Sequence, residues 1–122
     1  KVDISLSTIV RDGNSSQTRK KEYRAVLDTG AAPVIVCRAA LPEGVRIHQL
    51  DEPPLLVDAQ RKALSIAGVV KAVIQMGRGE YRVAALVADD LSVDVILGTQ
   101  FIDSHVQLIN ARRRSVTMDG GD

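Results

Sequence analysis

The chain has 122 residues, a net charge of +1 and a hydrophobic content of 45%. This length suits a single domain with a modest core, so we expect one domain spanning residues 1–122. The weak charge and the scarcity of aromatic residues (two Tyr, one Phe, no Trp) argue against nucleic-acid binding. No apolar run is long enough for a membrane span and no signal peptide is evident, so we expect a soluble protein of the cytoplasm.

The first quarter of the chain predicts two strands separated by a polar loop. Residues 2–7 alternate apolar and polar side chains, as in a strand buried on one face. Residues 11–20 are polar and contain an Asp-Gly-Asn sequence, which indicates a turn or a mobile hairpin loop. Residues 23–27 then form an apolar strand that ends at Asp28.

Asp28 is the acid that the sequence singles out. The Thr-Gly-Ala-Ala-Pro that follows it cannot continue the strand, so we expect a sharp turn beside a buried carboxylate. Such a carboxylate costs roughly several kcal/mol in desolvation unless it is paired, hydrogen-bonded or protonated. A structural alternative exists, because an Asp before Thr-Gly commonly caps the backbone amide two residues on. The apolar flanks and a second motif favour a catalytic acid.

The middle of the chain predicts short strands joined by turns. Residues 34–37 and 45–50 are expected as strands on either side of a turn that contains Pro and Gly. Residues 55–66 predict a hairpin with a polar tip. Residues 70–76 and 80–87 predict a second hairpin around a Gly-Arg-Gly turn.

The last third predicts a strand, a short helix and two closing strands. Residues 93–97 form an apolar strand that Gly98 ends, and a helix of one or two turns follows from Thr99 to about His105. Residues 107–110 and 115–118 would be closing strands, and residues 119–122 a flexible tail. Many short strands and one short helix predict an all-β fold that is closed or barrel-like.

The two glycine-ended strands together resemble a known family. The first carries Asp28-Thr29-Gly30-Ala31, and the second runs through Ile96-Leu97-Gly98 into a helix, with Gly98 seventy positions after Asp28. This pair resembles the retropepsins, the retrovirus-type aspartic proteases, and looks closest to their gypsy-type retrotransposon branch. The resemblance covers residues 21–118. It implies a closed β-barrel half with one short C-terminal helix, completed by a homodimer.

The chemistry of this family needs a second acid. Two carboxylates share one proton, and together they activate water and protonate the scissile carbonyl. The chain has one Asp-Thr-Gly, and the alternatives Asp58, Asp94 and Asp103 lack its context. A two-fold axis would supply the second acid by bringing two copies of Asp28 together. The resemblance therefore implies an aspartic endopeptidase with one catalytic Asp28 from each subunit.

The resemblance also implies roles for the residues around Asp28. Thr29 would hydrogen-bond across the two-fold axis, and Gly30 would let the substrate backbone approach closely. The hairpin of residues 55–66 would be the flap that closes over the substrate. The expected substrate contacts lie in the cleft floor, the pocket walls and the flap: Ala31, Ala32, Ile35, Val57, Asp58, Ala59, Gln60 and Ile96.

Three positions depart from the pattern of the family. The predicted flap tip has no glycine, Ala32 occupies a position that is often polar, and Thr99 replaces the arginine of viral members. The last two differences suit the retrotransposon branch.

Two alternative functions stay open. The chain could be a catalytically weak or inactive dimerisation and peptide-binding module, or a monomeric fragment of a two-lobed protease. The expected partners are a second copy and a peptide or polyprotein, without nucleic acid or membrane. No cofactor or metal is expected, since the lone Cys37 and His48 lack companions at ligand spacing.

Overall fold

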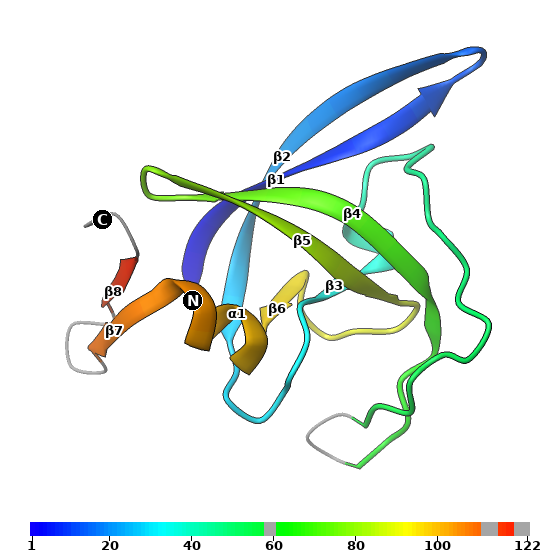
Figure 1. Cartoon of the computed structure of the whole chain (residues 1–122). Helices are drawn as coiled ribbons and strands as arrows, with labels where there is room; N and C mark the ends of the chain where they lie inside the picture. Colours follow the sequence, from blue (N-terminus) through cyan, green and yellow to red (C-terminus); the bar gives the residue numbers. More distant parts are fainter. Residues whose placement is uncertain (58–60, 111–114, 119–122) are drawn as a thin grey trace.

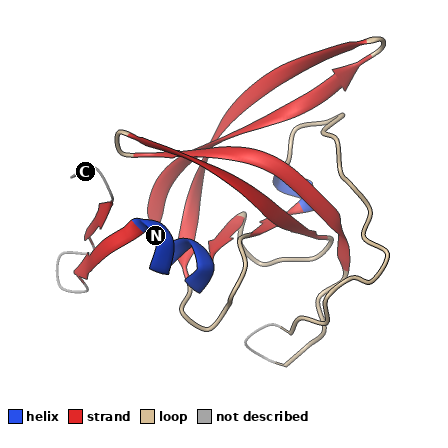
Figure 2. Cartoon of the chain, in the orientation of Figure 1, coloured by secondary structure: helices blue, strands red, loops and turns tan. Residues whose placement is uncertain are grey.

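The computed structural model describes residues 1–57, 61–110 and 115–118. Figure 1 shows these residues as a barrel from which one long hairpin projects, and Figure 2 shows how much of the chain is strand. The elements are β1 (Val2–Asp12), β2 (Ser15–Leu27), β3 (Ile35–Cys37), the 3₁₀ turn η1 (Arg38–Ala40), β4 (Ile66–Met76), β5 (Gly79–Ala88), β6 (Val95–Leu97), α1 (Thr99–His105), β7 (Val106–Asn110) and β8 (Ser115–Met118).

Six of the described strands close into a barrel in the order β1-β2-β6-β3-β5-β4. Antiparallel pairing of β1 with β4 closes it, from Ser5 opposite Gln75 to Thr8 opposite Ala72. The pairs β2–β6 and β3–β5 are parallel, while β7 and β8 form a separate antiparallel pair. The predicted all-β closed barrel with one short helix near the C-terminus is therefore confirmed.

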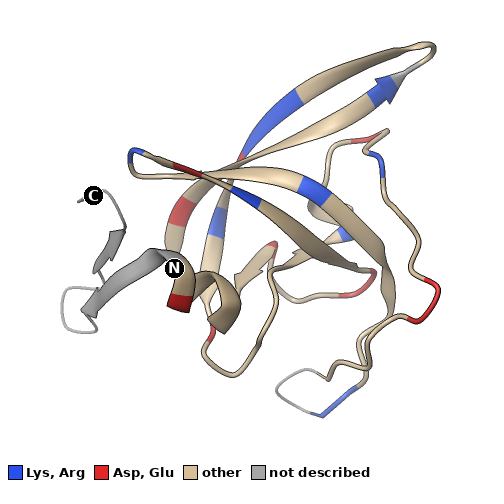
Figure 3. Ribbon diagram, in the orientation of Figure 1, with Lys and Arg blue, Asp and Glu red and all other residues tan. Residues whose placement is uncertain are grey.

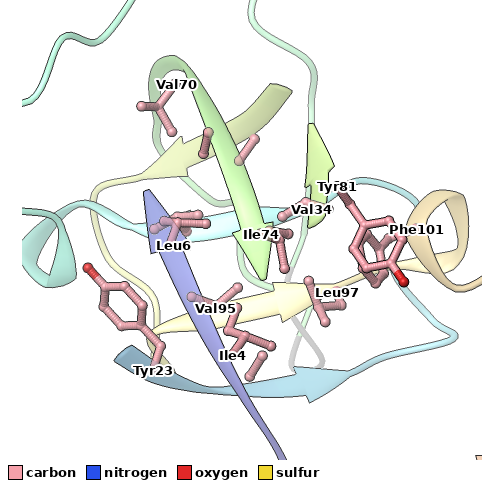
Figure 4. Close-up of a cluster of buried hydrophobic side chains, with 14 of the residues drawn as sticks. Ile4, Leu6, Tyr23, Val34, Val70, Ile74, Tyr81, Val95, Leu97 and Phe101 are labelled. Carbon is pink, nitrogen blue, oxygen red and sulfur yellow. The ribbon is translucent and has the colours of Figure 1, made fainter. Parts of the chain in front are cut away.

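Aliphatic side chains fill the barrel, because alternate positions of each strand point inward. Leu6, Ile74, Val95 and Leu97 are among the side chains that lie wholly inside it (Figure 4). Each such side chain contributes about 1.5–3 kcal/mol by its removal from water.

One pair of aromatic rings joins the helix to the barrel. The rings of Tyr81 on β5 and Phe101 on α1 meet edge to face, with centroids 5.6 Å apart and an interplanar angle of 84° (Figure 4). This geometry is the one that the ring quadrupoles favour, and it adds about 0.5–1.5 kcal/mol to the buried area. The start of α1 is thereby fixed against the barrel wall.

Tyr23 links β2 to the turn that follows β3. Its hydroxyl donates a hydrogen bond of 2.6 Å to the carbonyl oxygen of Ala40. Burial of the ring, and secondarily the negative charge of Asp94, raise the pKa of Tyr23 to about 12. The hydroxyl is therefore protonated and able to donate at any physiological pH.

The turn predicted within residues 11–20 is present at Gly13 and Asn14, but a loop over the whole of this stretch is wrong. β1 and β2 instead pair residue by residue out to Asp12 opposite Ser15, and only Gly13 and Asn14 form the turn. Residues 15–22 are all exposed, because this part of the hairpin projects beyond the barrel (Figure 1). Two paired strands outside the core satisfy the hydrogen bonds of their backbones without an apolar face. The polar composition of this stretch therefore did not indicate strands.

Two other predicted strand regions are reduced in the structure. Residues 45–50 form isolated bridges instead of a strand, with Val45 opposite Val10 and His48 opposite Val69. In the predicted hairpin of residues 55–66, one bridge pairs Val57 with Ala63, and the tip at residues 58–60 lies outside the described residues. The tail at residues 119–122 also lies outside them.

Within the described residues, no helix has both the length and the apolarity needed to cross a membrane.

Candidate active site

Asp28 is the first residue beyond β2, at the end where β2 lies parallel to β6. Its backbone N–H donates to the carbonyl oxygen of Leu97 at 3.0 Å, which extends the ladder by one bond. Its Oδ1 accepts a hydrogen bond of 2.8 Å from the N–H of Gly30. The carboxylate is therefore folded back over its own turn, as the capping alternative predicts.

The side chain of Asp28 is less buried than the sequence predicts. It is half-buried, and Thr29 and Gly30 after it are exposed. The apolar run ends one residue earlier, and the turn then carries the chain to the surface of the barrel. Among the described residues, the carboxylate is hydrogen-bonded only to Gly30, and no second carboxylate bonds to it.

The residues after Asp28 are held by the start of the helix. The N–H of Thr99 donates to the carbonyl oxygen of Ala31 at 2.8 Å, and that of Gln100 donates to Ala32 at 2.9 Å. The first amides of a helix have no partner inside it, so these carbonyls satisfy donors that would otherwise need water. We refer to residues 28–33 as the Asp28 loop.

Gly98 makes this arrangement possible. A Cβ at this position would contact the carbonyl oxygen of Pro33 and lie 2.6 Å from that of Ala32 and 2.7 Å from that of Ala31. Only a residue without a side chain fits there. The two motifs that the sequence singles out are thus in direct contact, since the second motif supplies the surface against which the first is packed.

The other predicted floor and wall residues lie close to this loop in the fold. Ile35 on β3 is opposite Ile96 on β6, and Ile96 is in turn opposite Val26 on β2. Ile35 is only 3% exposed and belongs to the core, whereas Ile96 and Ala31 are half-buried and Ala32 is exposed. The surface beside Asp28 is therefore formed by small and aliphatic side chains.

The predicted flap hairpin is described only in its stem, residues 55–57 and 61–65. The N–H of Leu64 donates to the carbonyl oxygen of Leu56 at 2.8 Å. Leu55 is 87% exposed and Val57 is 57% exposed, so these aliphatic side chains face solvent. The predicted contact residues Asp58, Ala59 and Gln60 lie outside the described residues.

A polar cluster that the sequence did not reveal holds the base of this stem. The N–H of Asp89 donates to the carbonyl oxygen of Ser65 at 2.8 Å, and the hydroxyl of Ser65 donates to Oδ2 of Asp89 at 3.0 Å. Arg38 donates to Oδ1 of Asp89 at 3.1 Å. These hydrogen bonds, that from Arg38 foremost, lower the pKa of Asp89. Ser65 lies 24 positions and Arg38 lies 51 positions from Asp89 in the sequence, so no local pattern could have predicted the cluster.

Two hollows on the surface, of about 980 and 540 Å³, lie away from Asp28, which lines neither. The described residues contain no group of three or more side chains able to hold a metal ion. The carboxylate of Asp28 is thus half-buried at the barrel surface, outside both of these hollows.

Comparison with known proteins finds a likeness among solved structures. No family model matches the chain, and no curated protein matches it. Among solved structures, the chain is similar to the crystal structure of the retroviral protease-like domain of Ddi1 from Leishmania major. The TM-score is 0.60 and the identity is 16%, over 93% of this chain and 87% of that one. The chain therefore has a retropepsin-like fold, while the likeness does not favour the gypsy-type retrotransposon branch.

Proposed function

We propose that the chain is an aspartic endopeptidase of the retropepsin type, in which Asp28 from each of two subunits forms the catalytic dyad. The observation that carries the proposal is the Asp28 loop, which presents one carboxylate at the surface of a retropepsin-like barrel. The loop is fixed to β6 and α1 by three backbone hydrogen bonds, those of Asp28, Thr99 and Gln100. Such fixation suits an acid that must meet its counterpart in one geometry.

In the proposed mechanism the two carboxylates share one proton. The ionised Asp28 takes a proton from a water molecule as the water oxygen attacks the scissile carbonyl carbon. The protonated Asp28 of the other subunit donates its proton to the carbonyl oxygen. The N–H of Gly30 holds Oδ1, so Oδ2 is left to face water and the second subunit. Two carboxylates close enough to share a proton cannot both ionise, so we expect the highest activity at acid to mildly acid pH.

The substrate of the proposed enzyme is an extended peptide bound between the Asp28 loop and the flap. Ala31, Ala32 and Ile96 offer partly exposed surface beside the acid, and the exposed Val57 lies on the flap stem. Thr29 would hydrogen-bond across the two-fold axis. Processing of a polyprotein in the cytoplasm is part of this proposal, and so is membership of the gypsy-type branch, which Ala32 and Thr99 suit.

Substitution of the acid tests the proposal. Asp28→Asn should abolish cleavage of a mixed peptide library between acid and neutral pH and leave the fold and the dimer intact. Asp103→Asn, which changes an exposed acid on α1, is the matched control and should keep full activity. Wild-type cleavage should be blocked by pepstatin. Proteolysis that survives in Asp28→Asn would show that a different residue is the catalytic acid.

The hydrogen bond from Gly30 to Asp28 specifically favours a second candidate function. A capped turn accounts for an Asp at this position even without catalysis, so the chain could be a dimerising, peptide-binding module. Capture of library peptides without products would support the module. Solution mass separates both candidates from a two-lobed fragment, because the fragment would be monomeric.

A further inference from the structure

The second of the two hollows lies where two hairpins separate. β1 pairs with β4 only as far as Thr8 opposite Ala72. Beyond that point β1 continues with β2 into the projecting hairpin, while β4 continues with β5 (Figure 1). Between the two hairpins is a hollow of about 540 Å³, which we call the fork hollow. Its size is within the range of binding sites for small molecules and short peptide segments.

Ile9, Lys71 and Arg82 are the side chains through which the fork hollow offers binding energy. Residues directly opposite each other in a sheet point to the same face, and so do residues two apart. By the register, Lys71 is opposite Ala84 and Val73 is opposite Arg82, which places these four on one face. Ile9 contributes a large aliphatic surface from β1 and is 49% exposed.

The charged residues of the fork hollow are both cations. Lys71 and Arg82 are exposed, and neither forms an ion pair within the described part of the chain. They are diagonal neighbours across β4 and β5, which corresponds to a spacing of roughly 7–8 Å. No acid is among the described lining residues, and Glu80 is the acid next along the same face of β5. Figure 3 shows cations on both β4 and β5.

We propose that the fork hollow binds an extended, acidic segment of a partner protein in which acidic and aliphatic residues alternate. In an extended chain, acids two positions apart lie roughly 7 Å apart on one side, which matches the spacing of the two cations. The residue between them points to the other side, and Ile9 lines the hollow from the projecting hairpin, across from β4 and β5. Carboxylates then pair with Lys71 and Arg82 while an aliphatic side chain covers exposed apolar surface.

Charge argues against insertion of the projecting hairpin of a second copy of this chain. That hairpin carries Arg19, Lys20 and Lys21 in a row, which would bring like charges against Lys71 and Arg82. A fully enclosed small molecule is also disfavoured, because Lys71, Arg82 and Ile9 leave the hollow open to solvent. This site is separate from Asp28, so it is independent of the proposed function.

Peptide titration of the ¹⁵N-labelled full chain tests the proposal. The probe is a capped octapeptide that alternates Leu and Glu, compared with a Leu–Gln peptide and a Ser–Glu peptide of equal length. The Leu–Glu peptide should shift the backbone amides of residues 7–9 and 71–73, and the binding should weaken with added salt. We expect each comparison peptide to bind about tenfold more weakly, since each lacks one of the two kinds of contact.

Substitutions of charged residues inside and outside the fork hollow distinguish binding at this site from a general effect of net charge. Lys71→Glu combined with Arg82→Glu should weaken binding of the Leu–Glu peptide by at least about tenfold. Arg19→Glu is the matched control, because Arg19 is an exposed cation of the projecting hairpin that does not line the hollow. Ile9→Ser should weaken the same peptide and leave the unfolding transition unchanged.

The proposal is overturned if no peptide shifts these amides, if the shifts map to the Asp28 loop, or if the Leu–Gln peptide binds equally well. An equal effect of Arg19→Glu and of the double substitution would overturn it too.

Discussion

The Asp28 loop and the flap stem would form opposite sides of the proposed cleft, yet the barrel holds them differently. The loop is fixed by hydrogen bonds to Leu97, Thr99 and Gln100 and by close contact with Gly98. The two sides of the stem are joined to each other by one described bridge, and the base is joined through Ser65 to Asp89, the residue after β5. Its side chains Leu55 and Val57 face solvent.

This difference is the one that the proposed reaction requires. Segments with few buried contacts and exposed hydrogen bonds open at low free energy, whereas packed ones open only when the whole domain unfolds. A floor that positions an acid must belong to the second group, and a cover that admits and releases a peptide must belong to the first. Three substitutions probe the contrast, one in the floor, one in the barrel wall and one at the base of the stem.

The substitution in the floor should have the largest effect on stability and on peptide cleavage. In Gly98→Ala the added Cβ would lie 2.6 Å from the carbonyl oxygen of Ala32 and 2.7 Å from that of Ala31. Backbone atoms on both sides leave no flexible group to yield, so we expect a loss of about 3 kcal/mol in the free energy of unfolding. The Asp28 loop would shift with it, and peptide cleavage should be lost. Urea denaturation and a cleavage assay measure the two effects.

Gly13→Ala is the matched control for this change. Gly13 has a φ of +61° and no atom within 4 Å of the added Cβ, so the cost is conformational and about 1 kcal/mol. Cleavage should be retained, because the turn lies at the far end of the projecting hairpin. Equal losses for both variants would mean that Gly98 is not a special contact and that the floor is no tighter than a surface turn.

The sequence predicted the strands and the helix that flank the Asp28 loop, because their signals are local. The apolar runs before Asp28 and Gly98 and the helix end at His105 each follow from neighbouring residues, and each is confirmed. The contact between Gly98 and the carbonyls of the Asp28 loop could not be predicted, because it depends on how two distant segments pack. The pairing of Ser65 and Arg38 with Asp89 depends on packing in the same way.

The regions that sequence patterns missed lie outside the core. Residues 11–20 belong to a hairpin ladder although they are polar, because the backbone groups of β1 and β2 hydrogen-bond to each other. The fork hollow exists only because the pairing of β1 with β4 stops at Thr8. Where burial does not impose alternation, composition no longer distinguishes a strand from a loop.

The barrel wall should give a smaller effect, in the stabilising direction. Thr8 is only 1% exposed, and its buried Oγ1 has no hydrogen-bond partner among the described residues. Thr8→Val replaces this hydroxyl with a methyl group of similar size, so the free energy of unfolding should rise by about 1 kcal/mol. Thr18→Val, at an exposed position, should change nothing measurable. Hydrogen exchange in the stem should be the same in both variants, because local opening does not require the wall to unfold.

The base of the stem should give the smallest global effect and the most local one. Asp89→Asn weakens the hydrogen bonds from Arg38 and Ser65 at an exposed site, so the free energy of unfolding of the whole domain should hardly change. The amides of Leu64 and Asp89, which donate at the stem, should nevertheless exchange faster. Asp90→Asn, which changes the neighbouring exposed acid, should leave both amides protected.

The pH dependence identifies the charge as the cause. The hydrogen bond from Arg38, and then that from Ser65, lower the pKa of Asp89 below its ordinary value of 3.8. A lowered pKa in the folded state means that the carboxylate stabilises the stem above pH 3.8, and that this contribution is lost as the pH falls through the lower, folded-state value. The difference in the exchange rates of the Leu64 and Asp89 amides between wild type and Asp89→Asn, corrected for intrinsic rates, should therefore be constant near neutral pH. It should shrink once the pH falls below 3.8 and the carboxylate of the wild type is protonated. A difference that persists into strong acid would mean that the Asn side chain disturbs the stem by its shape and not by the loss of charge. The hydrogen-bonded carboxylate of Asp89 would then not be what holds the base of the stem to the barrel.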